Sequence, residues 1–359
     1  MRREIGMFVA LLLLCTALWF SNHDFLGLSN VVNTSRQIAM LGILAIGIGF
    51  VIVTGGIDLS IGSVVGLTGV LIAHYSALKE DGGQGMSIWA GISIAMAAAL
   101  GIGLIQGLLI TRLKLQPFIV TLGFMLLIRG VSQTIAQGGS LSLGDIPFAN
   151  LAERGFFEVD EVARVSYPVL ICLAVILIAG YVLHFTVFGR YVYAIGGNRD
   201  AAEYSGINVK RVETAAYVIS AGLAGVAGLC FSAYTKQNNH NLGQGYELYA
   251  ITAAVLGGCS LRGGEGTIFG IVIGTCVMRV IENGFDIFQL KLHGAGGQTE
   301  IFKLDPNKKN IVIGITILLA VVIDQVIHMV QAKRRTRRAG EIVAARQRAL
   351  EAGGTGNLS

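Results

Sequence analysis

The sequence predicts an all-α polytopic membrane protein with about ten transmembrane helices, some of them broken. The 359 residues are 53% hydrophobic and only 14% charged, whereas soluble domains carry about 25% charged residues. Apolar runs recur along the chain, and about 20 apolar residues suffice to cross a bilayer as a helix. Because only four prolines and no low-complexity tract separate these runs, we expect a single transmembrane domain over residues 1–331.

The candidate spans follow one another with short connections. The first, residues 5–21, has no small-x-small cleavage site before WFSNHDF, so we interpret it as a helix and not as a signal peptide. The eighth, residues 248–261, is short and rich in glycine, which predicts a broken or partial span. The full set is 5–21, 37–54, 60–78, 88–111, 117–136, 167–188, 214–234, 248–261, 266–283 and 311–330.

The distribution of basic residues sets the expected orientation. With the N-terminus inside, most of the 27 Lys and Arg fall on the cytoplasmic side, and the acidic loop 145–161 falls outside. Lys and Arg of short loops prefer the cytoplasm. Both termini are therefore predicted to be cytoplasmic. The tail 332–359 begins with the basic run KRRTRR, which suits an anionic leaflet, and we expect the tail to be disordered.

The longest predicted cytoplasmic loop interrupts the apolar pattern between the sixth and seventh spans. It contains AIGGNRDAAEYSGINVKRVE, residues 194–213. Asn198 is a favourable N-cap, Asp200 suits the first turn of a helix, and Gly206 suits its C-terminal stop. The resulting helix of about two turns is too short to be stable alone in water. It therefore needs a surface to dock against; an ordinary solvated loop is the alternative.

Two glycine-rich motifs interrupt the spans at the same predicted face of the membrane. In TGGIDLSIGS, Gly55 and Gly56 each weaken a helix by about 1 kcal/mol relative to Ala, and Asp58 and Ser60 follow. A carboxylate at membrane depth is costly and is by default a functional candidate. Asp58 has two open interpretations, a group of the translocation pathway or gate, or a buried helix cap at the cytoplasmic mouth. The pattern GGxxLxxG recurs at residues 257–264, which suggests an internal repeat.

The sequence lacks the motifs of common catalytic and metal sites. GxxxxGK[ST], HExxH and CxxC are absent, and the five cysteines stand singly in apolar runs. We therefore expect no enzymatic activity, no ATP hydrolysis by this chain, no cofactor and no metal. Two arginines lie inside spans. Arg129 is expected to find a carbonyl or acidic partner, and Arg279 to pair with Glu282 on the same helix.

Four stretches of the sequence resemble the permease subunits of sugar-type ATP-binding-cassette importers, the ribose, xylose and galactose family. They occur in the family's order, within residues 40–285, and each alone is a weak signal because glycine-rich apolar runs are common. The four stretches are VTGGIDLSIGSVVGLTG (53–69), LQPFIVTLGFMLLIRG (115–130), FGRYVYAIGGNRDAAEYSGINVKRVE (188–213) and LGGCSLRGGEGTIFGIVIG (256–274). Two stretches depart from the family pattern, the long polar outer loop 286–310 and the basic tail after Gln331.

The resemblance implies uptake of a monosaccharide across the bacterial inner (plasma) membrane. A periplasmic or extracellular solute-binding protein would deliver the sugar, and a separate ATP-binding-cassette ATPase subunit would drive transport. A second permease copy, expected as a homodimer, would complete the pore within membrane lipid; no nucleic acid is implied. The expected ATPase-coupling loop comprises Asn198, Arg199, Asp200, Ala201, Ala202, Glu203, Tyr204, Ser205, Gly206 and Ile207. The candidates for the translocation pathway or a broken helix are Gly55, Gly56, Asp58, Ser60, Gly257 and Gly258.

Three other functions compete with this interpretation. A proton-coupled secondary transporter would use Asp58 as its titrating group and would need neither ATPase nor binding protein. An importer permease for branched-chain amino acids is the next alternative within the same class. A membrane-embedded enzyme is disfavoured, because no catalytic constellation is present. The spans hold few charges, which suits a neutral polar solute better than an ion.

Overall fold

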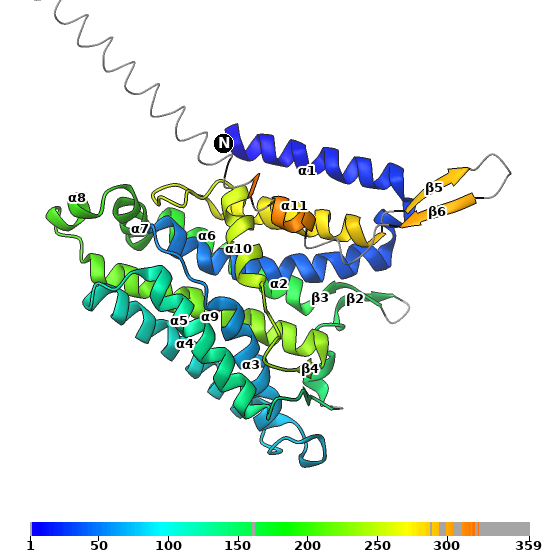
Figure 1. The fold of residues 1–359 in the computed structure, drawn as a ribbon, viewed down its shortest axis with the longest axis horizontal. Coiled ribbons are helices and arrows are strands. Elements are labelled where there is room, and N and C mark those ends of the chain that lie inside the picture. Colours follow the sequence, from blue (N-terminus) through cyan, green and yellow to red (C-terminus); the bar gives the residue numbers. More distant parts are fainter. Residues whose placement is uncertain are drawn as a thin grey trace, which may run out of the picture.

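The structure, a computed structural model, describes residues 2–144, 146–159, 162–287, 289–293, 299–303, 311–316, 318–319 and 322. Helices dominate this part of the chain (Figure 1). They are α1 (Arg2–Ser21), α2 (Leu28–Val53), α3 (Ile61–Ser76), α4 (Ile88–Arg112), α5 (Pro117–Ile135), α6 (Tyr167–Phe185), α7 (Val187–Gly197), α8 (Arg199–Tyr204), α9 (Val209–Thr235), α10 (Tyr246–Leu256) and α11 (Ile268–Ile287). Short 3-10 turns are η1 (His23–Leu26), η2 (Lys79–Asp81) and η3 (Pro147–Asn150).

The long helices run between two ends that differ in structure. Figure 1 shows α7 and α8 at one end, together with the start of α1, and the paired strands β2–β3 and β5–β6 at the other. The strands form antiparallel pairs, so the expected all-α class holds for the spans but not for the connections. The pairs are β1 (Leu141–Ser142) with β4 (Gln237–Asn238), β2 (Gly155–Val159) with β3 (Val162–Ser166), and β5 (Gln289–His293) with β6 (Thr299–Lys303).

Helix α9 is the centre of the bundle, because it packs against α4, α2 and α3. Small residues allow these close approaches, as expected from the small-xxx-small spacings. A Cβ on Gly225 would lie 3.0 Å from Cβ of Ala99 in α4, and a Cβ on Gly228 would lie 2.7 Å from Cβ of Thr68 in α3. These glycines of α9 therefore serve packing inside one chain. Helix α2 is also largely buried, whereas only 22% of the apolar window is buried in each of α4, α5 and α6.

The described helices overlap nine of the predicted spans but differ from them at several ends. Seven helices of the described residues are long and apolar enough to cross a membrane, and α3 and α10 are shorter apolar helices. Helix α2 begins at Leu28, nine residues before the predicted span. The sixth span ends at Phe185, because Thr186 caps a separate helix, α7, by accepting a hydrogen bond from the Gly189 backbone N–H. Of the predicted span 311–330, residues 311–316 are helical and most of the remainder lies outside the described residues, as does the tail 332–359.

The segment between β4 and α10 explains why α10 is short. It packs by its backbone along one face of α3, where glycines recur at helical spacing. A Cβ on Gly66 would lie 2.8 Å from the carbonyl oxygen of Leu242, and a Cβ on Gly62 would lie 2.5 Å from that of Gly243. Because residues 240–245 form consecutive turns instead of a helix, α10 spans only 11 residues, a rise of about 16 Å, roughly half of the hydrocarbon thickness. The predicted broken or partial eighth span is therefore confirmed as a short helix.

Candidate functional site

The expected two-turn helix is present as α8. Its N-cap is Asn198, whose Oδ1 accepts a hydrogen bond from the Ala201 backbone N–H at 2.9 Å. The helix ends at Tyr204, and Gly206 just beyond it has φ +83°, a left-handed conformation that glycine adopts without strain. The sequence prediction of both helix ends is therefore confirmed.

The two faces of α8 differ sharply in exposure. Tyr204 is 91% exposed, whereas Ala202 is only 4% exposed and belongs to the apolar core. The Ala202 side chain therefore holds α8 onto the body of the protein. The residues available to a partner are the exposed ones, Asn198, Arg199, Asp200, Ala201, Glu203, Tyr204, Ser205 and Gly206, with Ile207 partly buried.

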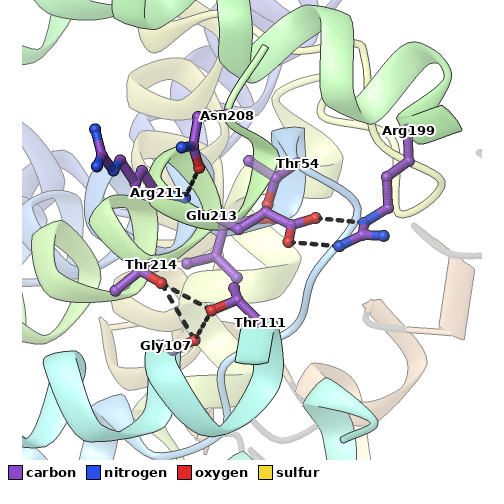
Figure 2. Close-up of polar contacts among 9 residues, drawn as sticks. Thr54, Gly107, Thr111, Arg199, Asn208, Arg211, Glu213 and Thr214 are labelled. Carbon is purple, nitrogen blue, oxygen red and sulfur yellow. Dashed lines mark hydrogen bonds and ion pairs between the residues drawn. The ribbon is translucent and has the colours of Figure 1, made fainter. Parts of the chain in front are cut away.

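An ion pair ties α8 to the first turns of α9. The Arg199 guanidinium donates to the Glu213 carboxylate through Nε at 2.9 Å and through Nη2 at 3.2 Å (Figure 2). This bond to Glu213 raises the pKa of the Arg199 guanidinium above its usual value. A two-bond pairing also fixes the relative orientation of the partners. Sequence reasoning missed this contact, since the fourteen-residue separation contains a helix end and a turn.

The two glycine-rich motifs and the end of α7 meet at one place. A Cβ on Gly263 would lie 2.9 Å from both Cα of Gly196 and the backbone N of Gly55. The Gly264 backbone N–H donates to the Val53 carbonyl, the last residue of α2, at 2.8 Å. Because these contacts are between backbones, no side chain fits at Gly263. The fold thus joins the α2–α3 connection, the α10–α11 connection and the helix preceding α8.

A cleft of about 340 Å³ opens beside this junction. Gly55 and Gly56 contribute to its wall, and Arg199 and Glu213 lie at the same cleft. Tyr217 of α9 also lines it, and its buried hydroxyl has no hydrogen-bond partner among the described residues. The remaining lining residues are Thr54, Ile110, Lys114, Leu115 and Pro117. Helix α8 and the first glycine motif therefore share a cavity.

Asp58 lies behind the cleft and is fully buried. One carboxylate oxygen accepts from the Ser60 backbone N–H at 3.0 Å and from the Ser60 hydroxyl at 2.7 Å. The other accepts from the Ser220 hydroxyl of α9 at 2.9 Å, and Gln106 of α4 donates to Ser60 at 2.8 Å. The network links the start of α3 to α4 and α9. Both carboxylate oxygens of Asp58 are therefore hydrogen-bonded next to Ser60, the N-cap residue of α3.

Gly257 and Gly258 do not line the cleft. Gly257 packs against α11, where an added Cβ would lie 2.2 Å from the Gly270 carbonyl oxygen. Gly258 has φ +98° and open space where a Cβ would lie. These two glycines therefore end α10 and allow the turn toward α11, at the junction's edge.

Charged side chains inside the spans partly follow the expectations. Arg279 pairs with Glu282, as predicted, and its guanidinium also lies over the Tyr246 ring, 5.0 Å from the centroid. Nε and Nη2 of Arg129 are buried without a hydrogen-bond partner among the described residues, but the Arg129 charge interacts electrostatically with the acidic side chain of Glu247 in α10. Sequence reasoning missed Glu247, which is buried at the start of α10, one residue before the predicted span.

Comparison with known proteins places this geometry in context. Residues 30–321 match the protein family described as branched-chain amino acid transport system / permease component. The ribose import permease protein RbsC of Escherichia coli K12 is 36% identical over 318 residues, 88% of this chain and 92% of the relative. RbsC of Bacillus subtilis is 35% identical, covering 90% and 93%. The galactose/methyl galactoside import permease protein MglC of Salmonella typhimurium is 35% identical, covering 79% and 86%. No solved structure matches the chain.

Proposed function

The chain belongs to the family of membrane permease subunits to which these importer proteins belong, and we propose that it forms the transmembrane pathway for monosaccharide uptake by an ATP-binding-cassette importer. The family description names branched-chain amino acid transport, but the relatives with named solutes import ribose or galactose. At about 35% identity over most of the chain, these relatives favour a sugar over an amino acid. The fold fits an integral membrane protein of the bacterial plasma membrane, because seven helices within the described residues are long and apolar enough to span it.

One observation carries the mechanism that we propose, the exposed helix α8 attached to the junction of the glycine-rich motifs. Its outer face offers Tyr204 to a partner, and its inner side is held by Ala202 and the Arg199–Glu213 pair. A separate ATPase subunit that pulls or pushes α8 would act directly on α9 through Glu213. The same displacement would reach α2, α3 and α10 through the backbone contacts around Gly263. Rigid elements in contact are what transmit coupling between distant sites.

The proposed orientation places α7 and α8 in the cytoplasm and the β2–β3 hairpin outside. Arg190, Arg199, Lys210 and Arg211 belong to the α8 end of the bundle, and basic residues of short loops prefer the cytoplasm. The opposite end, with β2–β3 and β5–β6, would receive the solute-binding protein. A second copy of the permease, expected as a homodimer, would complete the pathway.

A line of polar groups suits a neutral, hydroxyl-rich solute. Buried polar atoms without hydrogen-bond partners among the described residues occur on Asn238, Glu247 and Arg129. Asn238 and Glu247 adjoin the glycine face of α3 at Gly69 and Gly62. Unpaired buried polar groups are costly, so a sugar or water that pairs with them in an open state would recover that cost. These side chains are candidates for the pathway.

Reconstitution tests the proposal directly. Proteoliposomes containing the permease and its ATPase should take up ribose or galactose only with ATP and the binding protein present. A secondary carrier would instead move solute under a pH gradient without ATP, and that result would overturn the assignment.

Asp58→Asn separates the two mechanisms at the residue level. Because Asp58 is saturated by Ser60 and Ser220, the amide should lower expression or transport rate without shifting the pH profile of uptake. Ser220→Ala, which removes one donor and no charge, is the matched control. A loss of pH-driven uptake with preserved exchange in Asp58→Asn alone would favour the proton-coupled carrier.

A further inference from the structure

An open groove of about 750 Å³ lies between α4 and α9 at the α8 end of the bundle. Its inner part is apolar, and Leu104 within it is 46% exposed. Three basic side chains stand at the groove's end, where α4 finishes at Arg112 and α9 begins with Lys210 and Arg211. The other lining residues are Leu108, Thr111, Asn208, Thr214, Ala215, Val218 and Ile219. The groove is therefore amphipathic along its length.

The basic end of the groove has no internal counter-charge. Arg112, Lys210 and Arg211 are exposed, and none of them forms an ion pair within the described part of the chain. The nearest acidic residue of α9, Glu213, is already bound by Arg199 (Figure 2). On the coupling loop, Glu203 lines a separate pocket with Lys210, so the two arginines carry the uncompensated charge. An anionic group is what this end lacks.

Hydroxyl groups form a polar floor next to the arginines. The Thr111 and Thr214 hydroxyls lie 3.0 Å apart, and both donate to the Gly107 carbonyl, at 2.7 and 3.3 Å (Figure 2). Both threonines line the groove. The lining of the groove therefore changes along its length. Basic side chains lie at the α8 end, threonine hydroxyls follow, and apolar side chains line the remainder.

A second groove of about 350 Å³ continues the first toward the middle of the bundle. The two grooves share Val218 and Ile219, and side chains of α2, α4, α6 and α9 line the second. Its far end reaches Val226, fifteen residues after Arg211, a rise of about 22 Å. One leaflet with its headgroups is about as thick, half of the roughly 40–45 Å of a whole bilayer. The continuous groove matches one lipid in depth.

We propose that this groove is a specific site for an anionic phospholipid. The phosphate pairs with Arg112 and Arg211, and one acyl chain follows the second groove past Ile219. A helix from another protein would fill the apolar part but would leave the basic end unpaired, whereas an anionic lipid satisfies both. Basic pockets between transmembrane helices on the cytoplasmic side commonly bind anionic lipid headgroups. Arg211 lies in the first turn of α9, the helix that follows α8. A lipid bound there would therefore also restrict the movement of α8. The site is independent of the solute carried.

Lipid titration of the delipidated full-length protein tests the site. Native mass spectrometry measures retention of phosphatidylglycerol and of phosphatidylcholine with the same acyl chains, and glycerol phosphate serves as a headgroup without chains. The wild type should prefer phosphatidylglycerol. The double variant Arg112→Gln with Arg211→Gln should bind phosphatidylglycerol about 30-fold more weakly. Its affinity for phosphatidylcholine should not change. Arg154→Gln with Arg190→Gln, two exposed arginines outside the groove, is the matched control and should change neither.

A second pair of variants tests the acyl-chain groove without altering charge. Ile219→Trp fills the point shared by the two grooves and should weaken the binding of both lipids. Leu177→Trp, at a 67% exposed position on α6 outside the grooves, should change the binding of neither lipid. Thermal melting confirms that each variant is folded.

Three results would overturn the proposal. The first is equal retention of phosphatidylglycerol by the wild type and the double arginine variant. The second is binding of glycerol phosphate as tight as that of the lipid, which would identify a soluble anion as the ligand. The third is a cross-link from Leu108→Cys to a second permease copy or to the ATPase in native membranes, which would show that protein covers the groove.

Discussion

Truncation of Tyr204 tests the proposed coupling role of α8 separately from its folding. Tyr204→Ala removes an aromatic ring that is 91% exposed in the isolated chain. Exposed side chains away from caps and cores change the free energy of unfolding by about 0.5 kcal/mol or less. The stability of the permease should therefore stay the same within that range.

The same truncation should cost much more in binding to the ATPase. Aromatic anchors at the centre of an interface contribute about 2 kcal/mol or more when truncated to Ala. At about 1.4 kcal/mol for each tenfold change, the dissociation constant should rise by about 30-fold. The exposed surface of α8 is small and contains one aromatic ring, so no neighbouring ring in the helix can replace it.

The assay pairs a binding measurement with a melting measurement. The permease in lipid nanodiscs is titrated with the purified ATPase, and thermal unfolding is followed on the same sample. Tyr181→Ala is the matched control, because Tyr181 is also exposed but lies on α6, which is a predicted span. Ala202→Arg should lower both binding and melting temperature, since Ala202 is buried under α8. An unchanged ATPase affinity in Tyr204→Ala would show that α8 is an ordinary solvated loop.

Three further predictions follow from the fold. Cysteines at Glu158 and Asn208 should be labelled by impermeant reagents from outside and inside respectively, and the opposite pattern would reverse the orientation. Gly66→Ala should lower the free energy of unfolding by about 1–3 kcal/mol through overpacking against three backbone carbonyls, whereas Gly130→Ala, with open space around it, should not; equal melting curves would contradict this. A double-mutant cycle on Arg199 and Glu213 should give a coupling energy of up to about 1 kcal/mol at neutral pH, because the Arg199 side chain is 46% exposed. Since the bond to Glu213 raises the pKa of Arg199, the guanidinium stays charged and the coupling energy should be the same at neutral and at mildly alkaline pH; its loss at mildly alkaline pH would refute this.

Local chemistry made the coupling helix predictable. Asn198 caps a helix wherever the following residues can turn, and Gly206 ends it because glycine accepts positive φ. The spans were predictable for a similar reason, since the length of an apolar run is set by the thickness of the bilayer. The separate helix α7 was missed, although Thr186 as its N-cap was a usable signal.

The direction of side chains required the tertiary structure. The sequence placed Ala202 and Tyr204 in one short helix but did not say which would be buried, because a helix of six residues carries too little periodicity to define a face. The partner of Arg199 was equally hidden, since Glu213 comes close only after the chain turns at Gly206.

By itself, the sequence determined a polytopic helical membrane protein, the position of the short helix α8 and its family. These features depend on composition, on apolar length and on motifs of neighbouring residues. Only the tertiary structure decided that Gly55, Gly196 and Gly263 meet beside the helix that precedes α8. It also decided that Ser60 and Ser220 enclose Asp58. Such contacts join segments far apart in the chain, and their partners are selected by how the helices pack around α9.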